Sequence, residues 1–299
     1  MSAPSDPQAA LRDFRRTSEF FIGIDSDGCA FDTMEVKHKE CFIPNIIRFF
    51  DLAAISKYAR EAAEFVNLYS HLRGTNRFPA LIHTFDLLAD RPEVARRGFL
   101  PPQVPGLRAW IGRETKLANP TLKAEVERTD DPDLVVTLEW SEAVNRTIGE
   151  VVHDVPPFPS VRESLSLMDG KADVMVCSAT PGEALEREWR EHSLASHVAL
   201  IAGQELGSKQ EHLALAAVGR YDRDKILMIG DAPGDRAAAE ANGVLFYPID
   251  PGIEDESWRR FHDEALPRFF AGTYAGAYMN DRVARFEALL PTRPPWRST

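Results

Sequence analysis

The chain has 299 residues, 44% of them hydrophobic, with a formal net charge of −11 and an isoelectric point near 5.3. This length accommodates one large domain, or a core with a smaller module. The acidic balance disfavours a nucleic-acid or anionic-membrane partner, because the long-range field repels polyanions. A small anionic substrate is compatible with this net negative charge, since local cations or a metal can set the sign of the charge inside a cleft.

The three cysteines, Cys29, Cys41 and Cys177, are odd in number and show no C-x-x-C spacing. We therefore expect neither a disulfide framework nor a zinc site. The N-terminal segment MSAPSDPQAALRDFRR lacks the apolar centre of a signal peptide, and no run approaches 18 apolar residues. We expect a cytoplasmic protein without a membrane partner, and the sequence leaves the oligomeric state open.

In chain order, residues 1 to about 17 predict a frayed arm or a short helix. The continuous apolar run FFIGID, 20–25, predicts a strand covered on both faces. From Met34 to about Val152, apolar residues recur at three- and four-residue spacing, and this pattern predicts helices over 40–52, 58–72, 78–89 and 133–152. The proline-rich segment 154–160, DVPPFPS, predicts a linker or hinge.

Beyond this linker, helices predicted at 161–168, 181–192, 209–220 and 235–243 alternate with strands at 172–179, 197–203, 225–231 and 244–250. Such alternation implies right-handed crossovers and a parallel sheet. The strand at 20–25 has no partner until about residue 172. We therefore expect an open, Rossmann-like α/β core, residues 1–33 and 154–299, with an inserted all-helical domain at 34–153. The last 45 residues predict one or two helices and a loose tail, PTRPPWRST.

Polar residues follow the predicted strands at their carboxyl ends, where open parallel sheets bind ligands. They are Asp25, Ser26 and Asp27; Ser178 and Thr180, on either side of Ala179; Asp231 and Asp235; and, after the loop near 200, Ser208 and Lys209. Carboxylates brought this close repel one another unless a hard divalent cation accompanies them. Magnesium fits best, because it uses one or two protein carboxylates and completes its shell with water and substrate phosphate.

Two predicted helix starts favour an anion site at the same edge. Thr180-Pro181-Gly182-Glu183 has an N-cap residue followed by proline and, at the third position, glutamate, and Ser208-Lys209-Gln210-Glu211 is a capping-box pattern. A helix N-terminus presents free N–H groups and a positive dipole, which suit a phosphate.

Together these motifs resemble those of the haloacid dehalogenase (HAD) superfamily of phosphatases. The family's Asp-x-Asp-Gly after an apolar strand matches IDSDG, and its Ser or Thr closing the next core strand matches Ser178 in VMVCSAT. Its lysine opening a helix matches Lys209 in LGSKQEHL, and its Gly-Asp with a further aspartate matches IGDAPGD. The order and spacing of these four motifs agree with those of the family over residues 19–33 and 155–250. The segment 34–153 resembles the helical cap that this family inserts after its first motif, although it is longer than expected.

The resemblance implies a magnesium-dependent phosphatase acting on a small phosphorylated metabolite. Asp25 would be the nucleophile that forms an aspartyl-phosphate, and Asp27 the general acid and base. The implied magnesium ligands are Asp25, the backbone carbonyl of Asp27, Asp231 and Asp235. The implied phosphate-binding residues are Ser178, Ala179 and Lys209.

Alternatives remain within this family and outside it. Asp27 favours phosphate chemistry, because the dehalogenase branch lacks an aspartate there. A sugar-phosphate mutase stays open, and so does a phosphonate hydrolase that forms a Schiff base on Lys37, Lys39 or Lys57. A non-catalytic metabolite-binding regulatory protein is the alternative from another class, and such a protein would be expected to have lost a motif residue.

In the helical segment, Gly74 interrupts YSHLRGTNRFPAL, 69–81, beside Arg73, Asn76 and Arg77. This pattern predicts a substrate-recognition loop, and the alternative is a helix–turn–helix with solvated arginines. Asp32 and Thr33 are expected to cap the first inserted helix. The tryptophans Trp110 and Trp140 are expected in the core of the helical domain.

Overall fold

The computed structural model describes residues 6–297, and the chain divides into two compact units. The core unit consists of Met1–Thr33 and Asp154–Leu289, and the helical unit of Met34–His153 and Leu290–Thr299. The chain therefore changes unit after residues 33, 153 and 289. The sequence analysis assigned everything after 154 to the core, whereas the segment from Leu290 on groups with the helical unit.

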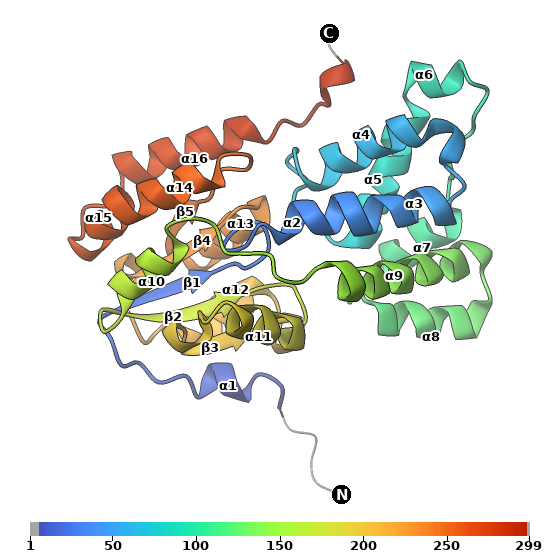
Figure 1. Cartoon of the computed structure of the whole chain (residues 1–299). Coiled ribbons are helices and arrows are strands. Elements are labelled where there is room, and N and C mark those ends of the chain that lie inside the picture. The colour runs from blue at the N-terminus through green and yellow to red at the C-terminus, as the bar shows by residue number, and fades with distance from the viewer. Residues whose placement is uncertain (1–5, 298–299) are drawn as a thin grey trace, which may run out of the picture. The chain divides into compact units, whose positions relative to one another are not determined.

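Five parallel strands form the sheet of the core unit, in the order β3-β2-β1-β4-β5 (Figure 1). The strands are β1 Phe20–Ile24, β2 Ala172–Cys177, β3 Leu200–Ala202, β4 Ile226–Gly230 and β5 Leu245–Pro248. The central strand β1 pairs with β2 on one side and β4 on the other. The predicted open α/β fold is confirmed, and the parallel order brings the carboxyl ends of β2, β1 and β4 side by side.

Helices cover both faces of this sheet. Ile22 and Ile24 pack on one face with apolar side chains from α10 Val161–Met168, α11 Gly182–Glu191, α14 Glu254–Arg260 and α15 Leu266–Phe270. On the other face, a Cβ added to Gly23 would lie only 3.2 Å from Leu213 Cδ2 in α12 Lys209–Ala216. Glycine at this position lets α12 approach β1 closely, and Lys209 is the first residue of that helix.

The remaining helices of the core unit flank this arrangement. They are α1 Ala9–Arg12, α13 Pro233–Asn242 and α16 Ala277–Leu289. Helix α13 ends as predicted at Gly243, whose left-handed backbone (φ 62°) suits a residue without a side chain. Helices α14, α15 and α16 exceed the one or two helices expected near the C-terminus.

In the helical unit, Phe78, Trp110 and Trp140 lie in one buried cluster, as expected for the two tryptophans. Its α-helices are α2 Thr33–Val36, which begins on the last residue of the core unit, α3 Ile43–Phe49, α4 Ser56–Asn67, α5 Arg77–Ala89, α6 Pro92–Ala95, α7 Pro105–Arg113, α8 Asn119–Thr129 and α9 Pro132–Val151. A π-helical turn, Lys37–Phe42, joins α2 to α3. Helices α6, α7 and α8 were not predicted, and each buries few residues.

The C-terminal segment packs on the helical unit instead of forming the expected loose tail. The ring of Trp296 lies against Phe65, with centroids 5.7 Å apart, and the guanidinium of Arg91 lies 4.4 Å from the Trp296 ring centroid. Arg297 forms an ion pair with Asp90. Arg91 is buried, so covering it with an aromatic ring gives residues 290–297 a structural role that the composition of the tail did not indicate.

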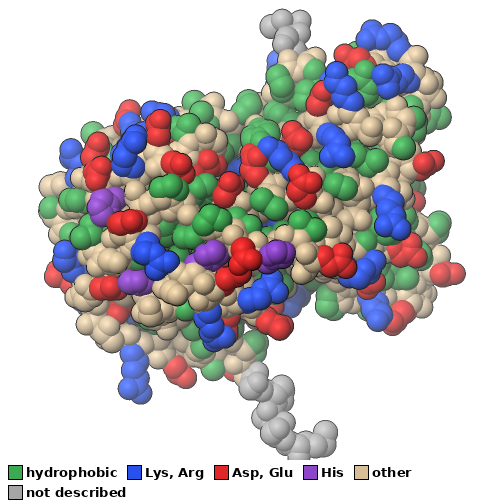
Figure 2. Space-filling model, viewed as in Figure 1, with side chains coloured by type: hydrophobic (Ala, Val, Ile, Leu, Met, Phe, Trp, Pro, Cys, Tyr) green, Lys and Arg blue, Asp and Glu red, His purple; other side chains and the backbone are tan. Residues whose placement is uncertain are grey.

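Acidic and basic side chains intermingle on the face of the molecule shown in Figure 2. On that face the net charge of −11 is therefore not concentrated in a single acidic field. Among the helices described over residues 6–297, none is long and apolar enough to cross a membrane.

Candidate active site

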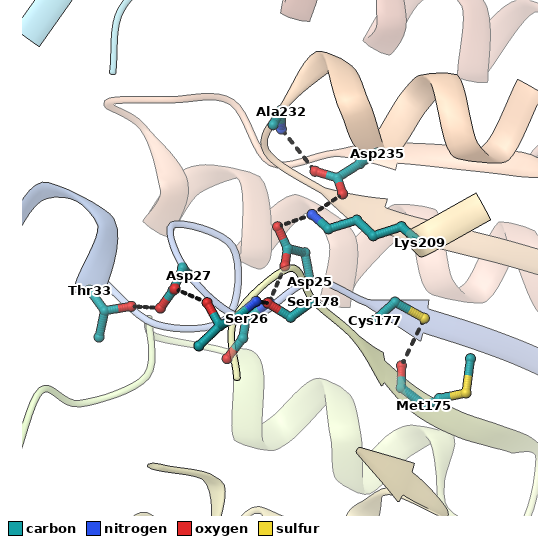
Figure 3. Close-up of polar contacts among 11 residues, drawn as sticks. Asp25, Ser26, Asp27, Thr33, Met175, Cys177, Ser178, Lys209, Ala232 and Asp235 are labelled. Atoms are coloured by element: carbon teal, nitrogen blue, oxygen red, sulfur yellow. Dashed lines mark hydrogen bonds and ion pairs between the residues drawn. The ribbon is translucent and has the colours of Figure 1, made fainter. Parts of the chain in front are cut away.

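The carboxyl ends of β1, β2 and β4 bring the predicted polar residues of the core unit together (Figure 3). Asp25 follows β1, Ser178 follows β2 and Asp231 follows β4, and each is at most 5% exposed. One carboxylate oxygen from each of Asp25, Asp231 and Asp235 lies within 4.8 Å of the others. Three acidic groups from two distant parts of the chain thus share one small buried volume.

Lys209 joins two of these carboxylates. Its Nζ donates to Asp25 Oδ2 at 2.6 Å and also to Asp235 Oδ1. Burial raises the pKa of Asp25 to about 6, although Lys209 acts in the opposite direction. Burial also opposes the charge on Lys209, yet attraction to Asp235 and Asp25 raises the pKa of Lys209 well above its ordinary value. The charged Lys209 therefore offsets part of the negative charge of the buried carboxylates.

Gly230, the residue before Asp231, leaves room for the side chain of Asp235 at the end of β4. A Cβ added to Gly230 would lie 2.3 Å from the Cβ of Asp235, a distance that no side chain tolerates. Asp235 lies in the first turn of α13, and its Oδ2 accepts a hydrogen bond of 3.0 Å from the Ala232 amide. The motif IGDAPGD therefore folds so that both of its aspartates reach the same point.

Asp27 is held apart from this cluster by two hydroxyl groups. Thr33 Oγ1 donates to Asp27 Oδ1 at 2.5 Å, and Thr180 Oγ1 donates to Asp27 Oδ2 at 2.7 Å. The predicted N-cap role of Thr180 is wrong, because α11 begins at Gly182 and has no side-chain cap. Thr33 opens α2, but its hydroxyl is used on Asp27. Sequence reasoning missed both donors, although Thr180 follows Ser178 at the same strand end.

The two predicted helix starts differ in the structure. The capping box of α12 is confirmed: Ser208 Oγ accepts from the Glu211 amide, and Glu211 Oε2 accepts from the Ser208 amide at 2.8 Å. At the start of α11, the Gly182 amide donates to Glu205 Oε2 at 3.0 Å. This amide, which was expected to favour a phosphate, thus holds a carboxylate of the chain itself.

The end of β2 places a buried hydroxyl, that of Ser178, and an exposed residue, Ala179, at this edge of the sheet. Ser178 is buried, its amide donates to the carbonyl of Ala202 at 3.0 Å, and its Oγ accepts from the Thr180 amide at 3.2 Å. Ala179, between them, is exposed. This turn keeps Ser178 directly beside the Asp25 end of β1, as Figure 3 shows.

Arg73, Asn76 and Arg77 belong to the helical unit and are engaged within it. Arg73 is buried and donates to the Leu68 carbonyl at 2.9 Å. Asn76 caps α5, since its side chain accepts from the Phe78 amide at 3.1 Å. Solvated arginines, the alternative for this loop, are therefore excluded for Arg73.

Arg77 is hydrogen-bonded to side chains of α9. It donates to Ser141 Oγ at 2.9 Å and to Asn145 Oδ1 at 2.8 Å, and its guanidinium lies 5.0 Å from the ring centroid of Phe42. Burial lowers the pKa of Arg77 to about 10. Among the described residues, the hydrogen-bond acceptors of this guanidinium are all uncharged.

Comparisons with known proteins show a distant likeness to solved structures. No protein-family model matches the chain, and no match was found among curated proteins. The chain is similar to a HAD-superfamily hydrolase of subfamily IA from Geobacter sulfurreducens, with 19% identity, coverage of 79% of this chain and 89% of that one, and a TM-score of 0.39. It is also similar to a haloacid dehalogenase-like hydrolase from Streptococcus pneumoniae, with 13% identity, coverage of 83% and 93%, and a TM-score of 0.45.

A third similar structure, a haloacid dehalogenase-like hydrolase from Xanthomonas campestris, shows 11% identity, coverage of 87% and 96%, and a TM-score of 0.45. A likeness of this degree assigns neither a family nor an activity. Function has to be inferred from the residues at the carboxyl ends of the strands.

Proposed function

We propose that this chain is a magnesium-dependent phosphatase of the HAD superfamily that hydrolyses a small phosphorylated metabolite through an aspartyl-phosphate. The observation that carries the proposal is the Lys209 ammonium bound to both Asp25 and Asp235, with Asp231 beside them. Asp27, two residues after Asp25, is held separately by Thr33 and Thr180. One carboxylate is thus near a positive charge, and a second is hydrogen-bonded to neutral hydroxyls.

The residues present fit a magnesium ion. Asp25, Asp231 and Asp235 offer oxygen ligands only, which suits a hard cation, and their burial together makes a compensating charge necessary. Lys209 supplies one positive charge, which leaves an excess of carboxylates. The proposed ligands are these three aspartates and the backbone carbonyl of Asp27. Bound there, the metal would neutralise charge on the phosphoryl oxygens.

In the proposed reaction, Asp25 attacks phosphorus through a carboxylate oxygen, and the bond between phosphorus and the leaving oxygen breaks. Asp27 gives its proton to that leaving oxygen and then takes a proton from the water that hydrolyses the aspartyl-phosphate. Lys209, Ser178 and Ala179, through its backbone amide, are proposed to bind the phosphoryl oxygens. Thr33 and Thr180 keep the carboxyl of Asp27 in a fixed orientation between these two steps.

Two observations bear on the alternatives. A Schiff-base lysine has to be neutral to attack a carbonyl. Burial opposes the charge on Lys39, but hydrogen bonds to Glu35 and Tyr69 raise its pKa above the ordinary value, which disfavours Lys39 in a phosphonate hydrolase. A non-catalytic binding protein is disfavoured because each motif residue is present and Lys209 is bonded to both Asp25 and Asp235. A mutase, in which a sugar hydroxyl replaces water, uses the same residues and is separated from a phosphatase by experiment.

For substrate recognition by the helical unit, we propose Arg77 ahead of Arg73 and Asn76. The guanidinium of Arg77 is half-buried and all its acceptors are uncharged, so its positive charge is not yet paired and can attract an anionic group of the substrate. Arg77→Met is expected to raise KM for a substrate with a second anionic group and to leave KM for an aryl phosphate unchanged. Equal KM values for wild type and variant on every substrate would contradict this assignment.

The proposed function is tested by measuring phosphate release from p-nitrophenyl phosphate and then from a panel of phosphorylated metabolites, with magnesium or with EDTA. Wild type is expected to turn over in magnesium only, and Asp25→Asn is expected to be inactive. Identification of the product separates hydrolysis from phosphoryl transfer within a sugar phosphate. If purified wild type has no activity on the whole panel, the phosphatase proposal fails and the binding alternative gains support.

A further inference from the structure

Two buried tryptophans from different helices donate hydrogen bonds to the loop that follows β1. Trp189 Nε1, in α11, donates to Ser26 Oγ at 3.0 Å, and Trp258 Nε1, in α14, donates to the Cys29 carbonyl at 2.6 Å. Ser26, Cys29 and both tryptophans have no exposed surface. The loop between Asp25 and Thr33 is therefore anchored at two points by side chains distant in sequence.

Ser26 is the centre of this loop. Its carbonyl accepts from the amides of Cys29, Ala30 and Phe31, and its hydroxyl donates to Glu188 Oε2 at 3.0 Å while accepting from Trp189. The amide of Ser26 donates to Asp25 Oδ1 at 2.8 Å. A displacement of Ser26 would thus act directly on the carboxylate of Asp25.

Other contacts make the same loop rigid. Phe31 packs edge to face on Trp189, with ring centroids 5.6 Å apart, and the Phe158 amide donates to the Ala30 carbonyl at 3.0 Å. Loops at sheet edges are usually among the more mobile parts of a protein, whereas catalytic groups need placement within about 0.5 Å. Buried tryptophan rings can fix such a loop where their N–H groups donate to it, because the bond is shielded from water and the ring itself is held by packing.

We propose that Trp189 and Trp258 are positioning residues that fix the loop 26–31 and, through Ser26, the orientation of Asp25 and Asp27. The catalytic part of this inference rests on the proposed phosphatase function, and the anchoring of the loop does not. Neither tryptophan belongs to the four motifs, and neither touches the carboxylate cluster in any contact described above.

The test replaces each tryptophan by phenylalanine, which keeps a ring and removes the N–H donor. Trp189→Phe and Trp258→Phe are expected to lower kcat for the aryl phosphate by about 10- to 100-fold and to leave KM within about twofold, because small misplacements act on the reacting groups more than on binding. Trp110→Phe is the matched control: Trp110 is equally buried, but its Nε1 has no hydrogen-bond partner among the described residues. All three variants lose comparable ring volume, so a fall in kcat confined to Trp189 and Trp258 reports the hydrogen bonds.

Hydrogen exchange supplies a readout that does not need activity. The amides of Cys29, Ala30 and Phe31 are expected to exchange faster in Trp189→Phe and Trp258→Phe and unchanged in Trp110→Phe. In Ser26→Ala combined with Trp189→Phe, kcat is expected to fall no further than in Ser26→Ala alone, because Ser26→Ala already removes the bond from Trp189 together with the bond to Glu188.

The outcomes separate this inference from the proposed function. Unchanged loop exchange and unchanged kcat in both variants, with only the thermal midpoint lowered as in Trp110→Phe, would overturn the positioning role. Faster loop exchange in the variants of a wild type that hydrolyses no phosphate would overturn the phosphatase proposal and support the anchoring of the loop.

Discussion

Lys209 Nζ lies 2.6 Å from Asp25 Oδ2 and is bonded at the same time to Asp235. The lysine side chain is 17% exposed, and those of Asp25 and Asp235 are 7% and 0% exposed. In this arrangement one ammonium stabilises two buried carboxylates. In the proposed reaction the same ammonium also binds the phosphoryl oxygens, so its contributions to folding and to catalysis have to be measured separately.

Lys209→Met is expected to lower the free energy of unfolding in EDTA by about 3 kcal/mol, because it leaves buried carboxylates without their cation. Magnesium is expected to restore more stability to this variant than it adds to wild type. Urea unfolding with EDTA and with magnesium measures both effects. Lys209→Arg, which keeps the charge, serves as the control, and a Lys209→Met protein as stable as wild type in EDTA would contradict the bridging role.

Asp231→Asn and Asp235→Asn are each expected to weaken magnesium binding at least about tenfold, because an amide oxygen carries no full charge to offset the cation. Titration calorimetry of the pure protein measures the affinity directly. Asp222→Asn is the control, since the Asp222 side chain is 78% exposed and lies outside the cluster. Equal weakening in all three variants would show that the effect is not local.

Thr33→Val and Thr180→Val are each expected to lower kcat by about tenfold, with smaller changes in KM, because one hydrogen bond that orients Asp27 is lost. Thr84→Val is the matched control: Thr84 is buried in the helical unit, and its hydroxyl donates to the Ala80 carbonyl at 2.9 Å. Steady-state kinetics on one substrate suffices. Full activity in both Thr33→Val and Thr180→Val would mean that Asp27 needs neither hydroxyl.

Burial lowers the pKa of His212 from 6.5 to about 4, with the nearby charge of Lys209 acting in the same direction. The folded chain thus prefers the neutral imidazole. Its contribution to stability is complete above pH 6.5 and is lost as the pH falls toward 4. It amounts to about 3 kcal/mol by linkage between these two pKa values.

We therefore expect His212→Gln to flatten the dependence of the free energy of unfolding on pH between 6.5 and 4. Urea titrations at several pH values measure the slope. His71→Gln, at an exposed histidine, is expected to leave that slope as in wild type. A slope in His212→Gln identical to that of wild type would exclude His212 as its origin.

The arrangement of the motif residues could be predicted because parallel strands end at a common edge. Asp25, Ser178 and Asp231 each follow a strand recognisable from its apolar run, and Lys209 follows a capping serine. Helix α10 was predicted with its observed bounds, 161–168. Strand β3 was predicted too long, since only Leu200–Ala202 pairs with β2 at this edge of the sheet.

The partners of Asp27 could not be predicted in the same way. A threonine before a proline is equally compatible with capping the next helix, and only the path of the backbone after β2 decides that Thr180 turns toward Asp27. The hydrogen-bond partners of Trp189 and Trp258 could not be predicted either, because an apolar pattern indicates that a tryptophan is buried but not where its N–H group points. Helices α7 and α8 bury only Leu107, Trp110 and Leu122, too few for a clear periodicity.

The Trp296 ring packs edge to face on Phe65 and lies against the guanidinium of Arg91, so the helical unit cannot be transferred to another protein as one continuous segment of the chain. A fragment ending at His153 would lack the ring that covers a buried guanidinium. Exchanging residues 34–153 for the insertion of another protein would leave Trp296 and Arg297 facing a foreign surface. Domain-swapping experiments on this chain therefore have to transfer residues 290–297 together with 34–153, or the chimaera loses contacts that neither segment forms alone.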